Sequence, residues 1–228
     1  MEAGIVGKVE NDKIIKSFSG GRCPICALLR QDEFDLLCHW VGVSDEKYKT
    51  SKERNRLLES KGFCNYHFWE FERINTHYGS AEICIDFIEK LINALQEERG
   101  QNRFLGLLEY RRGLKCPLCA DLATNESAYI KDLLSLLNFQ KNRTKYAEGR
   151  GVCIPHLIQA AACVKDESLF SFLMEVQKKQ LERIRIDAAG LLSKKDAPLR
   201  WEQTDDEKNS YFRSIEKLVG RRGLRNGR

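Results

Sequence analysis

The 228-residue sequence has only four prolines and no apolar run long enough to cross a bilayer. A transmembrane helix needs roughly 20 consecutive apolar residues, so we predict no membrane-spanning segment and no membrane partner. The N-terminal residues 1–21 carry acidic side chains early and lack the apolar core of a signal peptide. This favours a cytoplasmic location.

Motifs of common enzyme classes are also missing. The sequence contains no HExxH, P-loop, GxSxG or GxGxxG pattern and no motif of paired carboxylates. An enzymatic function therefore has no motif in its support, and a non-enzymatic function is favoured. The net charge of +5, from 38 basic and 33 acidic residues, permits an acidic partner without requiring one.

Alternating β-branched residues, which would indicate strands, do not occur in runs. Apolar residues instead recur at steps of three and four, as in Ile83, Phe87, Leu91 and Leu95. The pattern predicts an all-α protein, with 193–207 as a linker. The predicted helices cover residues 26–40, 45–60, 64–77, 80–98, 127–140, 153–163, 167–192 and 209–219.

Cysteine, in contrast, is abundant. The nine cysteines are an odd number, so they cannot all pair within the chain. In a reducing cytosol, thiols more often serve metal binding or catalysis than a disulfide framework.

An internal repeat accounts for most of these cysteines. CPICA at 23–27 recurs as CPLCA at 116–120, and GFCNYHF at 62–68 recurs as GVCIPHL at 151–157. Both motifs recur in the same order, which predicts two tandem copies of one helical unit. We place the first repeat at 1–100, the second at 101–195, and a linker, a C-terminal helix and a basic tail at 196–228.

Each repeat supplies the ligands of a structural zinc site, which binds four cysteine or histidine side chains in a tetrahedron. A proline after the first cysteine and a helix start at the second would favour the thiolate. Gly62 and Gly151 would allow a sharply bent backbone just before the Cys-x-x-His pairs. The predicted ligands are Cys23, Cys26, Cys64 and His67 in the first repeat, and Cys116, Cys119, Cys153 and His156 in the second.

Pairing within each repeat closes the shorter loops and is the arrangement we expect. In the alternative, Cys23 and Cys26 meet Cys153 and His156 of the other repeat. Four protein ligands a site indicate two closed structural zinc ions rather than catalytic ones.

Two other chemistries use similar residues. An iron–sulfur cluster in each repeat would be held by three cysteines and one histidine, although four cysteines are usual. Dithiol redox chemistry at CPIC and CPLC is the second alternative, but such motifs accompany a βαβ pattern that this chain lacks. Cys38, Cys84 and Cys163 have no counterpart in the other repeat, so we interpret them as core residues. His39 and His77 are interpreted as surface residues.

The sequence pattern of the C-terminal region indicates a surface that packs on the protein itself or on a partner. Helix 209–219 places Phe212, Ile215, Leu218 and Val219 on one face, which we expect to pack against its own domain or a partner subunit. The tail that follows has four arginines, which are either solvated or in contact with phosphates. These are Arg221, Arg222, Arg225 and Arg228.

The function that these patterns favour is a zinc-binding helical module that binds protein or nucleic acid, with the tail and the charged 45–60 segment as contact regions. The doubled CPxC and GxCxxH motifs and the segment RWEQTDDEKNSYFRSIEKLVG resemble a family of uncharacterised bacterial and archaeal proteins. The resemblance spans nearly the whole chain. It implies a cytoplasmic helical protein with two metal-type sites, and it implies no particular activity.

Overall fold

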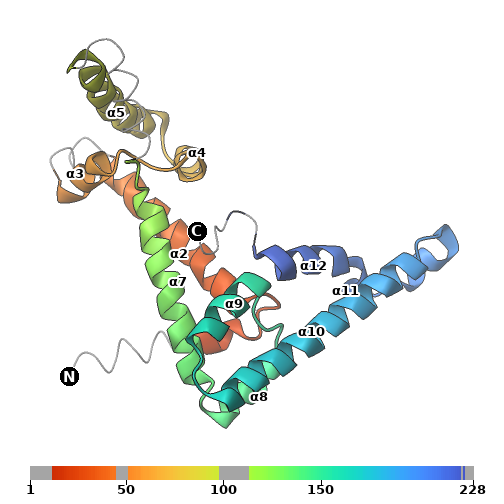
Figure 1. The fold of residues 1–228 in the computed structure, drawn as a ribbon. Helices are drawn as coiled ribbons and strands as arrows, with labels where there is room; N and C mark the ends of the chain where they lie inside the picture. Colours follow the sequence, from red (N-terminus) through yellow and green to blue (C-terminus); the bar gives the residue numbers. More distant parts are fainter. Residues whose placement is uncertain (1–11, 45–50, 98–112, 222, 224–228) are drawn as a thin grey trace. The chain divides into compact units, whose positions relative to one another are not determined.

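A computed structural model describes residues 12–44, 51–97, 113–221 and 223. These residues form helices and turns without any strand (Figure 1), which confirms the all-α prediction. Among them, no helix combines the length and the apolar character needed to cross a membrane.

The helices follow one another with short connections. Residues 12–17 are helical, and after them come α2 (Pro24–Val43), α3 (Lys52–Glu59), α4 (Asn65–Ile74) and α5 (His77–Glu97). After residues that the structure does not describe come α7 (Pro117–Leu136), α8 (Gln140–Glu148), α9 (Ile154–Cys163) and α10 (Glu167–Ser193). The last helices of the described residues are the 3-10 helix η2 (Ala197–Glu202), α11 (Asp205–Lys208) and α12 (Ser210–Val219).

The chain folds into two compact units that do not follow the order of the sequence. Unit 1 comprises Met1–Arg30 and Asn125–Arg228, and unit 2 comprises Gln31–Thr124. The chain passes between the units within α2 and again within α7. Each unit thus contains residues from both sequence repeats. The repeat boundary at 100/101 lies outside the described residues, and the 195/196 boundary remains a prediction about the sequence.

Unit 2 is built around an aromatic core. Trp40 of α2 packs edge-on against Phe63, with ring centroids 5.8 Å apart, and Phe63 contacts Phe71 at 5.3 Å. Ile83 and Phe87 of α5 belong to the same buried cluster, together with Cys116 and Leu118. This core therefore includes Cys116 and packs against Cys64 and Cys119, three of the predicted metal ligands.

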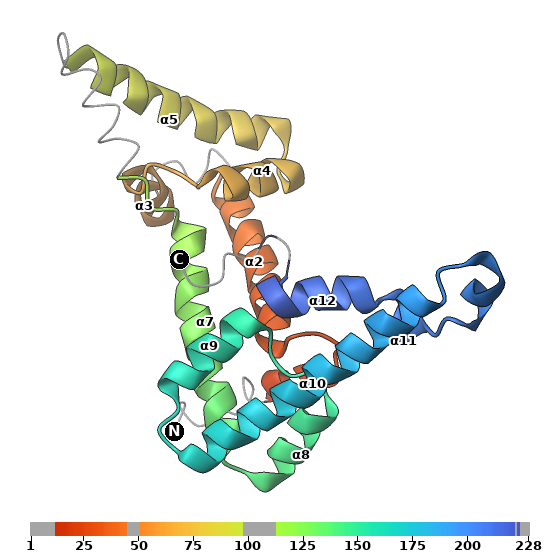
Figure 2. The same cartoon turned by 45° about the vertical axis from the view of Figure 1, so that its right-hand side comes forward.

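Unit 1 contains α8 to α12 and the C-terminal part of α7, from Asn125 onward (Figure 2). Leu133 and Leu137 lie fully buried, as do Leu169 and Leu173 of α10. Phe18 meets Tyr146 of α8 edge-on, with ring centroids 5.4 Å apart. Helix α12 packs on both α9 and α10.

Several predicted elements differ from the structure. Both CPxC motifs begin helices at their prolines, so α7 starts ten residues before the predicted 127. The 64–77 prediction ran through the break at Asn75, whose extended backbone ends α4. Helix α8 was not predicted, because its polar sequence QKNRTKYAE has almost no apolar stripe. The 193–207 linker contains η2 and α11, the latter held by a capping box from Thr204 and Glu207.

The interpretation of the unrepeated cysteines was wrong for two of the three. Cys38 and Cys163 are exposed, and Cys84 is partly buried. His39 and His77 are exposed, as predicted. Of the charged 45–60 segment, 45–50 lies outside the described residues, and α3 buries Arg54 and Leu57.

Helix α12 turns its apolar face outward, so the expectation that this face packs on its own domain was wrong, and the alternative of a partner subunit stays a prediction. Ile215, Leu218 and Val219 are 56%, 60% and 64% exposed, whereas Ser210 and Lys217 are buried. The polar side of the helix packs inward because Lys217 donates hydrogen bonds to the carbonyl oxygens of Arg150 and Val152. An amphipathic helix in this orientation presents a ready-made apolar surface.

Candidate metal centres

All eight predicted ligands lie in two clusters, each with three cysteines and one histidine. In each cluster, the ligand atoms all lie within 4.8 Å of one another. The cluster of unit 1, here called centre 1, consists of Cys23, Cys26, Cys153 and His156. The cluster of unit 2, here called centre 2, consists of Cys64, His67, Cys116 and Cys119.

The clusters join the two repeats, so the preferred pairing within each repeat was wrong. Each CPxC motif meets the Cys-x-x-His motif of the other repeat. The preference relied on loop closure, yet a loop several times longer costs only about 1 kcal/mol more. The helices decide the pairing instead. The 20 residues of α2 extend about 30 Å, and they carry the chain away from Cys23 before it reaches Cys64.

Each centre is formed by the first turns of two helices. Cys153 is the N-cap of α9 and Cys64 the N-cap of α4, each with extended backbone. Cys23 and Cys116 stand in the equivalent place, directly before Pro24 of α2 and Pro117 of α7. The second ligand of every pair follows three residues later on the same face. Helix N-termini favour anions, and they therefore favour the thiolate forms that bind metals.

The distances within the centres are short and uniform. Cys26 and Cys153 hold their sulfur atoms 3.8 Å apart, and Cys64 and Cys119 hold theirs 3.7 Å apart. The Nδ1 atom of His156 lies 3.1 to 3.5 Å from the three sulfur atoms of centre 1. His67 Nδ1 lies 3.3 to 3.4 Å from those of centre 2. In both centres, four ligand atoms surround one point.

The thiols of each centre cannot all ionise independently. The pKa of Cys116 is lowered to about 4 by its hydrogen bond with Cys119 and by His67, whereas that same bond raises the pKa of Cys119. In centre 1, burial opposes ionisation of Cys23, but hydrogen bonds with Cys153 and Cys26 lower its pKa well below the usual value. Ionised sulfur atoms at these distances repel one another unless a cation lies between them.

The raised pKa values of the two histidines also indicate that each centre lacks positive charge. Burial disfavours the imidazolium form, yet Cys116 and Glu33 raise the pKa of His67 to about 10. Burial likewise acts against His156, and Cys153, Cys23 and Glu126 raise its pKa to about 11. Each centre therefore attracts a cation, either a proton on the histidine or a metal ion among the ligands.

A glutamate holds the outer nitrogen of each histidine. Glu126 Oε1 lies 2.9 Å from His156 Nε2, and it also accepts a hydrogen bond from Gln159. Glu33 Oε1 lies 3.3 Å from His67 Nε2. Both glutamates are buried. A carboxylate on Nε2 keeps the proton there, which leaves Nδ1 free to face a metal and makes it more basic.

These glutamates were missed in the sequence, although a signal was present. Glu33 follows Cys26 by seven residues, and Glu126 follows Cys119 by the same seven. The repeat is therefore CPxC-x6-E. Each of these helices supplies two thiols to one centre and a carboxylate to the histidine of the other centre.

The backbone before the Cys-x-x-His motifs adopts the bend that was expected. Gly62 and Gly151 have φ angles of 99° and 62°, which L-residues rarely adopt. In unit 1, the loop at 149–152 is held from three helices. Tyr146 Oη accepts from the Val152 N–H, Gln180 donates to the Gly149 carbonyl, and Lys217 donates to two further carbonyls. The loop thus presents Cys153 rigidly.

A family model for a family of unknown function, DUF6062, matches residues 14–223, a range that includes both centres. The chain belongs to the DUF6062 family. Searches among curated proteins and among solved structures gave no match. For this DUF6062 member, function must therefore be argued from the two centres and the surfaces around them.

We predict that Glu126→Gln weakens metal binding at centre 1, and that Glu33→Gln does so at centre 2, each by about 10- to 100-fold. The neutral amide stabilises the histidine ligand less than a carboxylate does. Chelator competition on the metal-loaded protein should show one of two ions released early in each variant. Glu175→Gln, on the exposed face of α10, is the control. Equal retention of both ions in all three variants would contradict a role for the glutamates.

Proposed function

We propose that this DUF6062 protein binds two zinc ions in closed Cys3His sites that stabilise its fold, and that it acts as a non-enzymatic binding protein in the cytoplasm. The spacing of the ligand atoms carries the proposal. Tetrahedral bonds of about 2.3 Å to zinc place two sulfur atoms about 3.8 Å apart. The sulfur atoms of Cys26 and Cys153 lie 3.8 Å apart, and those of Cys64 and Cys119 lie 3.7 Å apart.

The same spacing favours one metal ion a centre over an iron–sulfur cluster. In a four-iron cluster each protein ligand binds a different iron atom, which spreads the ligand atoms around the whole cluster. Ligand atoms within 4.8 Å of one another leave no room for that core. A single iron ion would fit the same sulfur ligands, so the choice of zinc relies on the Cys3His donor set.

A closed site supports a structural role. A catalytic zinc keeps one coordination position for water or substrate. Here four protein ligands converge on each centre, and most of their side chains are buried. Dithiol exchange is also disfavoured, because each CPxC pair is already engaged with a cysteine and a histidine from the other repeat.

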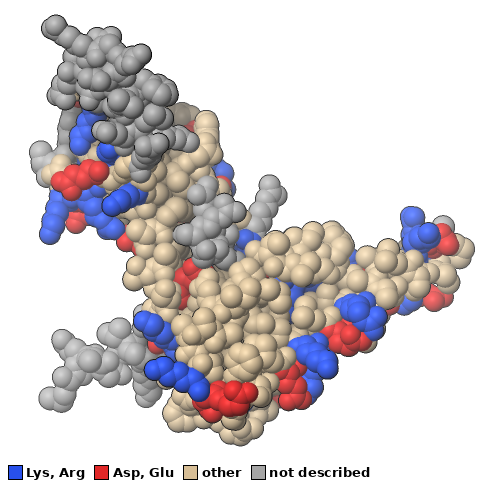
Figure 3. All heavy atoms as spheres, viewed as in Figure 1, with Lys and Arg blue, Asp and Glu red and all other residues tan. Residues whose placement is uncertain are grey.

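The surface of α12 supports a protein as the partner rather than nucleic acid. Nucleic-acid interfaces are strongly basic, whereas the exposed face of α12 is formed by Phe212, Ile215, Leu218 and Val219. Figure 3 shows a mostly tan surface over α12, with charged side chains gathered instead along α10. An apolar helix face of this kind fits a groove or a second helix on another protein. Of the basic tail, Arg222, Arg225 and Arg228 lie outside the described residues.

The metal content of cysteine variants tests both the centres and their pairing. We expect two zinc ions in the wild-type chain. Cys23→Ser combined with Cys153→Ser should lose one ion, because both residues belong to centre 1. Cys23→Ser combined with Cys64→Ser should lose both ions. Elemental analysis of anaerobically purified protein measures this, and iron with inorganic sulfide, or no metal, would refute the zinc assignment.

Metal removal tests the structural role. We expect chelation under reducing conditions to lower the helical circular dichroism and the melting temperature strongly. Structural zinc can contribute on the order of 10 kcal/mol of apparent stability in small domains. Restoring one equivalent of zinc per centre should restore both signals. An apo-protein with unchanged helicity and melting temperature would show that the metals are not structural.

Partner binding tests the α12 surface. We expect Ile215→Glu with Leu218→Glu to abolish binding of partner proteins that co-purify with the wild-type chain, because charges replace the apolar contacts. The comparison requires reconstitution with the purified partner and an unchanged circular dichroism spectrum. Leu192→Glu, also at an exposed apolar residue, is the control. If both variants bind the partner like the wild type, α12 is not the contact surface.

A further inference from the structure

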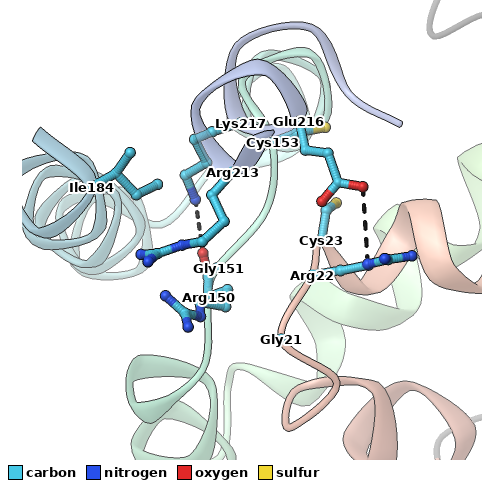
Figure 4. A pocket seen from close by; sticks show the side chains of 10 residues that line it. All are labelled: Gly21, Arg22, Cys23, Arg150, Gly151, Cys153, Ile184, Arg213, Glu216 and Lys217. Atoms are coloured by element: carbon cyan, nitrogen blue, oxygen red, sulfur yellow. Dashed lines mark hydrogen bonds and ion pairs between the residues drawn. The ribbon is translucent and has the colours of Figure 1, made fainter. Parts of the chain in front are cut away.

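A small cationic cavity of about 30 Å³ lies beside centre 1. Its lining includes Arg22, Arg150, Arg213 and Lys217, with Glu216 as the one carboxylate and with Cys23 and Cys153 of centre 1 at one wall. Figure 4 shows Arg213 and Lys217 extending from α12 toward the segment at Arg150 and Gly151, and Arg22 paired with Glu216 on the other side. Arg22 and Glu216 form an ion pair, so the cations without a carboxylate partner in the lining itself are Arg150, Arg213 and Lys217.

Two aspartates fix the arginines in place without using all their donors. Arg213 Nη1 donates to Asp187 at 2.9 Å and to Asp206 at 3.0 Å. Arg150 Nη2 donates to Asp206 at 2.9 Å. The Arg213 side chain is 11% exposed and the Arg150 side chain 27% exposed. The guanidinium groups are thus held in position before any ligand binds, which lowers the cost of binding.

Three buried guanidinium atoms have no hydrogen-bond partner among the described residues. These are the buried atoms Nε and Nη2 of Arg213 and Nη1 of Arg150. Nε and Nη2 form one edge of a guanidinium group, the edge that binds two oxygen atoms of an oxyanion side by side. Buried donors nearly always have a hydrogen-bond acceptor in proteins. Because Arg150 and Arg213 both line this cavity, their unsatisfied donors indicate that it binds an acceptor with several oxygen atoms.

We propose that this cavity binds a tetrahedral oxyanion of the phosphate type. Two arginines offer donors from different directions, which suits the three or four oxygens of a phosphate group better than the two of a carboxylate. Gly151 lines the cavity with φ at 62°, and a Cβ there would come within 3.3 Å of Gln177 and 3.5 Å of Lys217. A glycine thus leaves space at this wall of the cavity.

Neutralising the thiolates of centre 1 does not by itself explain the arrangement. A Cys3His site with zinc carries a net charge near −1. The ammonium group of Lys217 already lies close to this charge, because it donates a hydrogen bond to the carbonyl oxygen of Val152, the residue before Cys153. That role needs charge alone. It does not require two guanidinium groups with buried donors that lack a hydrogen-bond partner.

Calorimetric titration of the metal-loaded full chain with inorganic phosphate tests the proposal. We expect saturable binding and a rise in melting temperature, beyond the effect of sodium chloride at the same ionic strength. Acetate should bind more weakly than phosphate. Arg213→Lys keeps a cation near Asp187 and Asp206 but removes the two-donor edge, so phosphate affinity should fall roughly tenfold or more.

Arg150→Lys provides a second variant in case Arg213→Lys disturbs the packing of α12, and it should also weaken phosphate binding. Arg185→Lys, an exposed arginine on α10, is the matched control and should bind like the wild type. Equal phosphate affinity in Arg213→Lys, Arg150→Lys and the wild type would overturn the proposal. So would a wild-type response no larger than that to chloride, or acetate binding as tightly as phosphate. None of these results bears on whether zinc occupies the centres.

Discussion

Three sulfur atoms within 4.8 Å of one another can all be ionised at once only if positive charge lies among them. Both centres place their thiols in this arrangement, with Cys26 and Cys153 3.8 Å apart in one and Cys64 and Cys119 3.7 Å apart in the other. The helix N-termini that surround each centre supply part of the charge. The raised pKa values of His67 and His156 indicate that more is needed. The fold is thus arranged around two points that could each hold a metal ion.

Cross-pairing of the repeats links each centre to the rest of the chain. Helix α2 begins at the thiols of centre 1 and carries Glu33, which contacts His67 of centre 2. Helix α7 begins at the thiols of centre 2 and carries Glu126, which contacts His156 of centre 1. Each centre therefore depends on the first turns of two helices and on a glutamate that lies farther along a third helix. Ligand chemistry and helix packing cannot be separated in this protein.

Local patterns in the sequence predicted what they directly encode. The doubled CPxC and GxCxxH motifs identified all eight residues that form the centres, because ligand spacing within one helical turn is a local property. The apolar period predicted α9, α10 and α12 to within about a residue. The pairing of the motifs was not local. It depends on where α2 and α7 carry the chain, and a loop-length argument could not contain that information. The outward apolar face of α12 depends on Lys217 finding carbonyl acceptors at Arg150 and Val152, a contact that amphipathicity alone does not reveal.

The two centres are also nested along the chain, and this sets the order in which a ribosome can complete them. In the sequence, all ligands of centre 2 lie between the two halves of centre 1. Cys26 and Cys153 of centre 1 are separated by 127 residues, and His67 and Cys116 of centre 2, which lie between them, are separated by 49. During synthesis, centre 2 has its full ligand set once Cys119 has emerged. The thiols of Cys23 and Cys26 emerge first of all and wait longest for their partners. Over that interval these two thiols lack the other half of their centre, and the fold cannot yet bury them beside Cys153 and His156.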